Sequence, residues 1–125
     1  MSRQVSISDA EWMIMKALWQ NEGKAMTLKE IMEAVADSGW SYTTVRTMVG
    51  RLAAKGVIAA DESHPKSFRY TAVISEEACR REEMKSFIDR IFDGSARLMV
   101  SSLVSGRNLT REEQQTLLEI IDKME

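Results

Sequence analysis

Residues 41 to 56 of the chain read SYTTVRTMVGRLAAKG, and this stretch decides the fold. Ser41 is a typical helix N-cap residue, and Gly56 is typical of the position just beyond a helix C-terminus. Between them, apolar residues recur at the spacing of one helical face, which comprises Val45, Met48, Val49, Leu52 and Ala53. The stretch therefore predicts an amphipathic helix with one face buried in a core and the other open to solvent or to a partner.

The face opposite the apolar stripe has hydroxyl groups, arginines and small residues, and it has no carboxylate. It comprises Thr43, Thr44, Arg46, Thr47, Gly50, Arg51 and Ala54. No Asp or Glu occurs from Ser38 through Ala60, although the whole chain has 19 Asp+Glu against 17 Lys+Arg and a formal charge of −2. Small residues allow close approach to a DNA groove, hydroxyls bond phosphates or base edges, and arginine pairs with guanine. We interpret this face as a DNA-recognition surface; the alternative is a solvated helix face, which usually mixes Glu and Lys.

Two helices are expected before this stretch, because each begins with a capping box. Ser8 is followed three residues later by Glu11, and Thr27 is followed three residues later by Glu30. In such a box the hydroxyl and the carboxylate each accept a hydrogen bond from the other residue's backbone N–H. A short extended piece at residues 24–26 separates the two helices.

A β-hairpin is expected after the stretch. Residues 57–61 and 67–72 have the alternation of two strands, and Pro65 lies in the tip between them, where it interrupts no ladder. The order over residues 1–74 is thus helix, short strand, helix, helix, strand, strand. We interpret this half as a winged helix-turn-helix domain for DNA binding, so the predicted fold class is mainly α with a small β-hairpin.

The expected wing carries two cations, Lys66 and Arg69, which are placed to contact the phosphate backbone. Asp61 and Glu62 lie beside the tip and support the alternative of a solubilising turn. Ser41 stands where backbone N–H groups at a helix start point outward, which suits a phosphate. The residues that we expect to contact DNA are Ser41, Thr43, Thr44, Arg46, Thr47, Arg51, Lys55, Lys66 and Arg69.

Residues 75–125 predict three further amphipathic helices, and these are too short to bury their own apolar residues in a self-sufficient core. The simplest partner is the same segment of a second subunit about a two-fold axis; the alternative is the first half of the same chain. We therefore expect residues 75–125 to be a helical dimerisation region. Its contact residues are predicted to be Met84, Phe87, Ile88, Ile91, Phe92, Leu98, Leu103, Leu117, Ile120 and Ile121.

Several functional classes are excluded by the residues that the chain lacks. A lone cysteine, Cys79, excludes an internal disulfide and a cysteine-built zinc site within one subunit. A lone histidine, His64, leaves no Ser-His-Asp set, and neighbouring carboxylates such as Glu82 and Glu83 point apart on a helix. The sequence thus predicts no enzyme, no cofactor and no metal.

The sequence also predicts the cellular compartment of the protein. No segment is long and apolar enough to span a membrane, and the start MSRQVSISDAEW lacks the apolar core of a secretory signal. We expect a cytoplasmic protein that binds double-stranded DNA as a homodimer and has no membrane partner.

Several short motifs together carry a resemblance to a known family. They are Ile7-Ser8-Asp9-Ala10-Glu11-Trp12, Trp19, the run from Trp40 to Met48, Arg51-Leu52, Lys55-Gly56, Phe68-Arg69-Tyr70 and Phe92-Asp93-Gly94. With these motifs the chain resembles the penicillinase-repressor family (BlaI/MecI/CopY), more specifically in its first half than in its second. The resemblance implies a homodimeric repressor that binds palindromic operators through winged helices and dimerises through its C-terminal helices.

The resemblance also implies roles for single residues. Thr44, Thr47 and Arg51 match the recognition-helix pattern of the family and inherit a DNA-contact role. Thr43 and Arg46 lie at positions that vary within it, so they are expected to set the operator preference.

Two departures from the family concern the inducing signal. The copper-responsive branch has paired Cys-Xaa-Cys motifs near its C-terminus, and this chain has none, so copper sensing by that route is not expected. The β-lactam-responsive branch is cut at an Asn-Phe bond by a sensor-protease, and the aligned position here is Ser102-Leu103. Cleavage at this bond in response to a β-lactam stays a hypothesis, beside a metal or another signal. The alternative function is a winged-helix protein-interaction module that binds no DNA.

Overall fold

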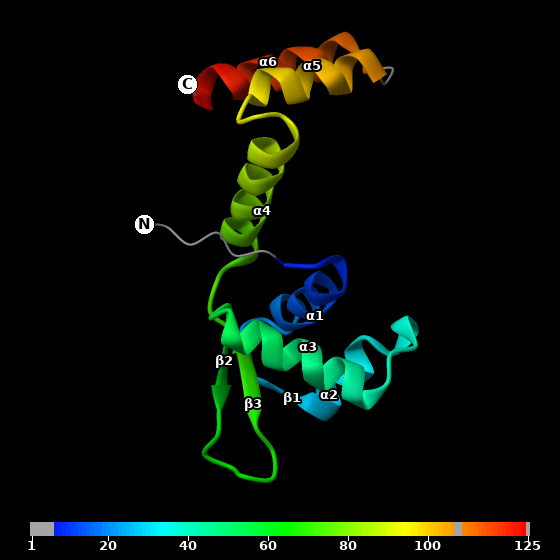
Figure 1. Ribbon diagram of the computed structural model, residues 1–125, viewed down its shortest axis with the longest axis vertical. Coiled ribbons are helices and arrows are strands. Elements are labelled where there is room, and N and C mark those ends of the chain that lie inside the picture. The colour runs from blue at the N-terminus through cyan, green and yellow to red at the C-terminus, as the bar shows by residue number, and fades with distance from the viewer. Residues whose placement is uncertain (1–6, 107–108, 125) are drawn as a thin grey trace. The chain divides into compact units, whose positions relative to one another are not determined.

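The computed structural model describes residues 7–106 and 109–124, and the chain divides into two compact units, Met1–Glu83 and Met84–Glu125 (Figure 1). The elements in chain order are α1 (Asp9–Gln20), β1 (Met26–Thr27), α2 (Leu28–Ala34), the 3-10 turn η1 (Ala36–Ser38), α3 (Tyr42–Ala54), β2 (Ile58–Asp61), β3 (Arg69–Ala72), α4 (Glu76–Ile91), α5 (Ala96–Gly106) and α6 (Arg111–Met124). The boundary between the two units falls inside α4. No helix in the described ranges is long and apolar enough to cross a membrane.

The helix starts predicted from cap residues are confirmed. Ser8 caps α1 and Thr27 caps α2, each in a complete capping box, with Glu11 and Glu30 returning the hydrogen bond. Ser41 caps α3 with its side chain. These local signals were sufficient because both partners of each bond lie within four residues of one another.

The sheet is wider than the expected hairpin. β1 joins the edge of β3 to give a three-stranded antiparallel sheet in the order β1-β3-β2. Met26 pairs with Tyr70, and Asp61 pairs with Arg69 on the other side of β3. The extra strand gives partners to backbone groups of β3 that a two-stranded hairpin would leave open. The predicted class, mainly helical with a small antiparallel sheet, is confirmed.

The core of the first unit is formed by the apolar faces of α1, α2 and α3 together with the start of β2. Its fully buried side chains include Ile14, Ile31, Val45 and Leu52. Trp12 and Trp19 pack against this core and against each other, with ring centroids 5.3 Å apart and planes at 70°. The unit thus buries the apolar stripes that its three helices carry.

The first half of α4 belongs to this unit. Cys79 is 2% exposed and lies in the same core, and the backbone N–H of Ile7 donates to Glu83 Oε1 at 2.9 Å. The indole Nε1–H of Trp19 donates to the carbonyl oxygen of Ile74 at 2.9 Å, in the segment that leads into α4. The compact unit therefore extends beyond residue 74, and the dimerising role of the later residues stays a prediction.

In the second unit, α5 and α6 pack against each other (Figure 1). Val100 of α5 and Ile88 of α4 are buried, so Ile88, which we expected at the subunit contact, is already covered within a single chain. Phe92 and Leu117 are half-buried, and the side chain of Ile121 lies outside the described residues. The other predicted contact residues are exposed, namely Met84, Phe87, Ile91, Leu98, Leu103 and Ile120.

Candidate nucleic-acid interface

The structure gives α3 the two faces that its sequence predicts. Val45, Met48, Val49 and Leu52 are buried against the core. The opposite side is exposed throughout, at Thr43, Thr44, Arg46, Thr47, Gly50, Arg51 and Ala54. α3 therefore presents a continuous face of hydroxyls, cations and small residues to whatever lies outside the protein.

Gly50 lies in the middle of this open face. A Cβ atom at this position would meet nothing within 4 Å, and its backbone does not need the left-handed region that favours glycine. Glycine inside a helix is less favourable than alanine by about 0.5–1 kcal/mol. Nothing in the described part of the chain therefore requires a glycine at this position.

The hydroxyl of Ser41 is engaged at the start of α3. Its Oγ accepts the backbone N–H of Thr44 at 3.1 Å and lies 3.0 Å from the Thr44 Oγ1. Both hydroxyls are exposed, so a phosphate would have to bind beside the cap or share it.

Lys55, which we expected at the DNA, has a different partner. Its Nζ lies 2.7 Å from Glu11 Oε1, and the Glu11 side chain is 4% exposed. Burial raises the pKa of Glu11, but hydrogen bonds from Lys55 and Ser8 outweigh it, so the net pKa lies below the ordinary value. The pair ties the end of α3 to the first turn of α1. In the single chain Lys55 therefore helps to position α3, and the DNA contact expected for it stays a prediction.

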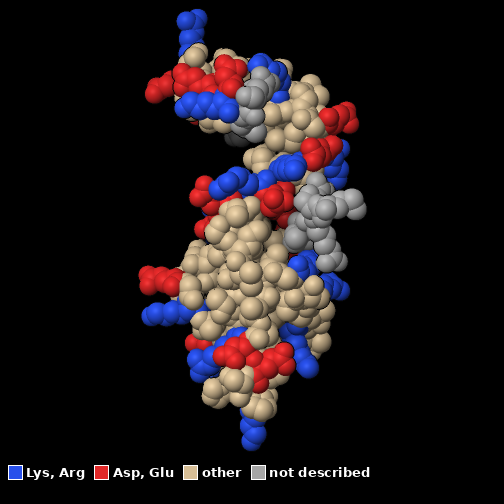
Figure 2. Space-filling model, turned by 90° about the vertical axis from the view of Figure 1, so that its left-hand side faces the viewer, with Lys and Arg blue, Asp and Glu red and all other residues tan. Residues whose placement is uncertain are grey.

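Arg69, one of the two cations of the wing, has acidic neighbours within the protein. Arg69 is near the carboxylates of Asp61 and Glu30, and each of these has a pKa below its ordinary value, chiefly through hydrogen bonds from Ser63 and Thr27 respectively. Figure 2 shows acidic and basic side chains side by side around the lower end of the first unit. The positive charge of Arg69 is thus partly balanced within the protein, as the alternative of a solubilising turn requires.

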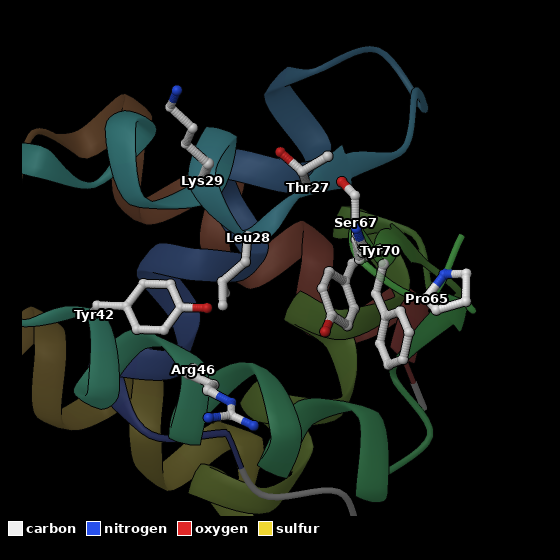
Figure 3. Close-up of a pocket in the computed structure, with 10 residues that line it drawn as sticks. Thr27, Leu28, Lys29, Tyr42, Arg46, Pro65, Ser67 and Tyr70 are labelled. Atoms are coloured by element: carbon white, nitrogen blue, oxygen red, sulfur yellow. The ribbon is translucent and has the colours of Figure 1, made fainter. Parts of the chain in front are cut away.

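A hollow of about 620 Å³ lies where the beginnings of α2 and α3 meet the wing (Figure 3). Arg46 and Lys66, both expected at the DNA, line it together with Lys29 of α2, which the sequence analysis did not single out. Arg69 is not among its lining residues, and neither is Arg51. The hollow therefore divides the expected contact residues into two groups.

Cys79 lies in the core of the first unit. Burial raises the pKa of the Cys79 thiol, and the nearby charges of Glu83 and Glu82 raise it further. Within the described ranges, no three His, Cys, Asp or Glu side chains are grouped so that they could hold a metal ion.

The sequence model described as "Penicillinase repressor" matches residues 7–123, which is nearly the whole chain. This chain belongs to the penicillinase repressor family. The resemblance inferred from its motifs is thereby confirmed, and the family is one of DNA-binding transcription regulators that act as repressors.

Curated relatives of the family match over almost their full length. The "Penicillinase repressor" of Bacillus licheniformis is 32% identical over 126 residues, covering 98% of this chain and 94% of that protein. The "Methicillin resistance regulatory protein MecI" of Staphylococcus aureus (strain N315) is 28% identical over 123 residues, covering 98% of each.

One solved structure aligns with 97% of this chain and 83% of its own, at 21% identity and a TM-score of 0.49. It concerns the regulation of DNA binding of Bordetella bronchiseptica BpsR by 6-hydroxynicotinic acid. At this level of similarity it carries no argument about the present chain.

Proposed function

We propose that this member of the penicillinase repressor family represses transcription as a homodimer that binds a palindromic operator. Each subunit places α3 in the major groove, and the two half-sites are separated by one helical turn of DNA or a multiple of it. The observation that carries the proposal is the exposed, carboxylate-free face of α3.

The charges on α3 support this proposal. Arg46 and Arg51 form no salt bridge with any residue in the described ranges, so both guanidinium groups are available to a nucleic acid. A bidentate arginine–guanine pair contributes about 1–3 kcal/mol of discrimination against other bases. An overall acidic protein can still bind DNA in this way, because the local field depends on where the charges lie.

The apolar residues of the second unit support the dimer. Six of the predicted contact residues are exposed in the single chain, and each large apolar side chain gains about 1.5–3 kcal/mol when it is fully buried. A second copy of the same surface is the simplest cover because it is self-complementary about a two-fold axis. Linking two winged helices then raises operator affinity, since the second half-site is bound at a high effective concentration.

A salt-titrated mobility shift on genomic fragments tests this function. Operator binding through phosphates should weaken steeply with ionic strength, because counterions are released from the DNA. Footprinting of the bound fragment should show protection with dyad symmetry. Absence of any protected sequence at low salt would refute the proposal and would favour an apolar protein-interaction module, whose binding hardly responds to salt.

Release from the operator is proposed to follow cleavage of the Ser102–Leu103 bond by a sensor-protease that responds to a β-lactam. Both residues are exposed on α5 in the single chain. Because Leu103 is also a predicted subunit contact, the dimer must open at this place and α5 must unwind locally before a protease can hold the bond. A cut there would separate helices that depend on one another for burial.

Intact-mass analysis of the repressor from β-lactam-treated cells is the measurement. It should show two fragments, one that ends at residue 102 and one that begins at residue 103. An uncut chain in cells whose target gene is induced would exclude this route and favour a metal or another signal.

A further inference from the structure

The hollow beside α3 has a mixed lining that a DNA groove contact alone does not explain. Its cations come from three separate elements, Lys29 from α2, Arg46 from α3 and Lys66 from the wing tip. In Figure 3 the Arg46 side chain lies below Tyr42 and Leu28, and the Lys29 side chain extends outward from α2, away from the other labelled side chains. Positive charge therefore surrounds the hollow on more than one side.

The inner part of the same hollow is apolar and aromatic. Leu28, Tyr42 and Tyr70 point into it in Figure 3, and Phe68 also lines it. Phe68 and Tyr70 lie on the same face of the wing because side chains alternate along a strand. Arg69, between them in sequence, points to the opposite face, beside Asp61 and Glu30.

The hydroxyl of Tyr70 is a hydrogen-bond donor at neutral pH. Burial raises its pKa, the neighbouring Tyr42 and Glu62 raise it further, and Arg46 opposes them without reversing the direction. Tyr70 therefore keeps its proton and can donate to an anionic oxygen. Tyr70 of β3 and Tyr42 and Arg46 of α3 all line the hollow, so α3 and the wing meet there.

A ligand that fits this lining has anionic groups toward the rim and apolar faces between them. The sugar–phosphate backbone of DNA has this composition, because charged phosphates alternate with deoxyribose rings. A free inorganic anion would match the three cations but would leave Leu28 and Phe68 unexplained. A chain of phosphates also suits cations that come from three different elements.

We propose that this hollow holds the sugar–phosphate backbone of one operator strand, with Lys29 and Arg46 as phosphate contacts. The proposal rests on the proposed function and assigns different roles to the two arginines of α3. Arg46 acts on any DNA sequence, whereas Arg51, which lies outside the hollow, is the arginine left to read bases. This differs from the operator-setting role that family resemblance implies for Arg46.

The test compares variants of the full chain on two duplexes, one selected by the wild type from a random library and one scrambled. Lys29→Met should reduce the slope of log K against log salt by about 1.8 for the dimer, because each of its two subunits loses one phosphate contact that contributes about 0.9. Arg46→Met should weaken binding by a similar factor on both duplexes. Phe68→Ala should weaken binding with an unchanged slope, because it removes no charge.

The matched control is Lys16→Met, which removes an exposed lysine of α1 outside the hollow. It should leave the slope unchanged, and thermal unfolding should show that each variant is folded. The inference is overturned if Lys29→Met behaves like Lys16→Met, or if the Arg46→Met loss is confined to the selected duplex. It is also overturned if inorganic phosphate competes with DNA beyond the effect of its ionic strength, which would indicate a free-anion site.

These failures are distinct from failure of the proposed function. If the wild type binds neither duplex at low salt, the repressor proposal itself is refuted. If the wild type binds the selected duplex and Arg51→Ala weakens it, the function stands whatever Lys29→Met does.

Discussion

The two units of the chain differ in how far the apolar side chains of their helices are buried. In the first unit the stripe of α3 is covered by α1, α2 and the sheet, and Val45 and Leu52 have no exposed surface. In the second unit Ile91 and Leu98 are more than half exposed although they are equally apolar. The difference supports the proposal that another surface covers the apolar side chains of the second unit.

The largest effect is expected from placing a charge on the exposed apolar surface of the second unit. Ile91→Asp should dissociate the dimer, because an uncompensated carboxylate would have to be buried at the subunit contact. Operator affinity should then fall by about 100-fold or more, the usual scale of bivalent binding. Sedimentation velocity and mobility shift measure the two consequences.

The matched control for that variant is Lys85→Asp, which also introduces a carboxylate into exposed α4 at a residue outside the apolar surface. It should remain a dimer. A dimer that survives Ile91→Asp would contradict the assignment of this surface.

A shortened chain tests where the first unit ends. A fragment of residues 1–83 should fold as a monomer, whereas a fragment of residues 1–74 should lose about 3 kcal/mol or more of its free energy of unfolding. The shorter fragment loses the buried Cys79 and the Glu83 carboxylate that accepts the Ile7 N–H. Urea unfolding followed by tryptophan fluorescence gives both values, and equal midpoints would show that α4 is dispensable.

The pair of Lys55 and Glu11 is expected to contribute to stability rather than to DNA binding. Lys55→Met leaves a buried carboxylate without its cation and should lower the free energy of unfolding by about 2 kcal/mol, below the full cost for a buried pair because Lys55 is partly exposed. The salt slope of operator binding should not change. A reduced slope would return Lys55 to the DNA-contact residues.

The same pair predicts a pH dependence. The pKa of Glu11 is lower in the folded chain than the ordinary value of a glutamate, so the unfolded chain binds the proton more readily. The stability that Glu11 contributes is therefore complete above that value and is lost as the pH falls through the folded pKa. Glu11→Gln should remove this part of the acid destabilisation in urea titrations.

Arg51→Ala tests the open face of α3. It should reduce discrimination between the operator and a scrambled duplex by about 1–3 kcal/mol for each half-site, because each subunit loses one guanine contact. The free energy of unfolding should be nearly unchanged, since Arg51 is exposed. Unaltered operator affinity in a mobility-shift titration would contradict the assignment.

The smallest effect concerns Gly50. Gly50→Ala should raise the free energy of unfolding by about 0.4–1 kcal/mol, because it favours the helix and meets no neighbour. Gly50→Leu should also stay folded but bind the operator several-fold more weakly, since its side chain would stand between α3 and the groove. Operator binding by Gly50→Leu at wild-type strength would show that DNA does not approach here.

Local features were predictable from the sequence, and contacts between distant residues were not. The capping boxes of Ser8 and Thr27 and the two faces of α3 depend on residues within a few positions of one another. The salt bridge of Lys55 with Glu11 joins residues 44 positions apart, and no periodicity predicts it.

The same limit applies to the sheet and to the second unit. The pairing of β1 with β3 depends on how the chain turns between them, which the residues 24–26 alone do not determine. Ile88 shares its helical stripe with Ile91, yet one is buried and the other exposed, because the packing around α4 and not the spacing decides which is covered.

The two tasks of α3 fall on different side chains. The core is contacted by Val45, Met48, Val49 and Leu52, and the end of the helix is held by the ion pair of Lys55. The outward residues contribute little to the stability of the fold. Substitutions on the outward side can therefore accumulate with little harm to the rest of the molecule. Under the proposed function, single substitutions on this side can therefore change the operator that the protein recognises without loss of the fold.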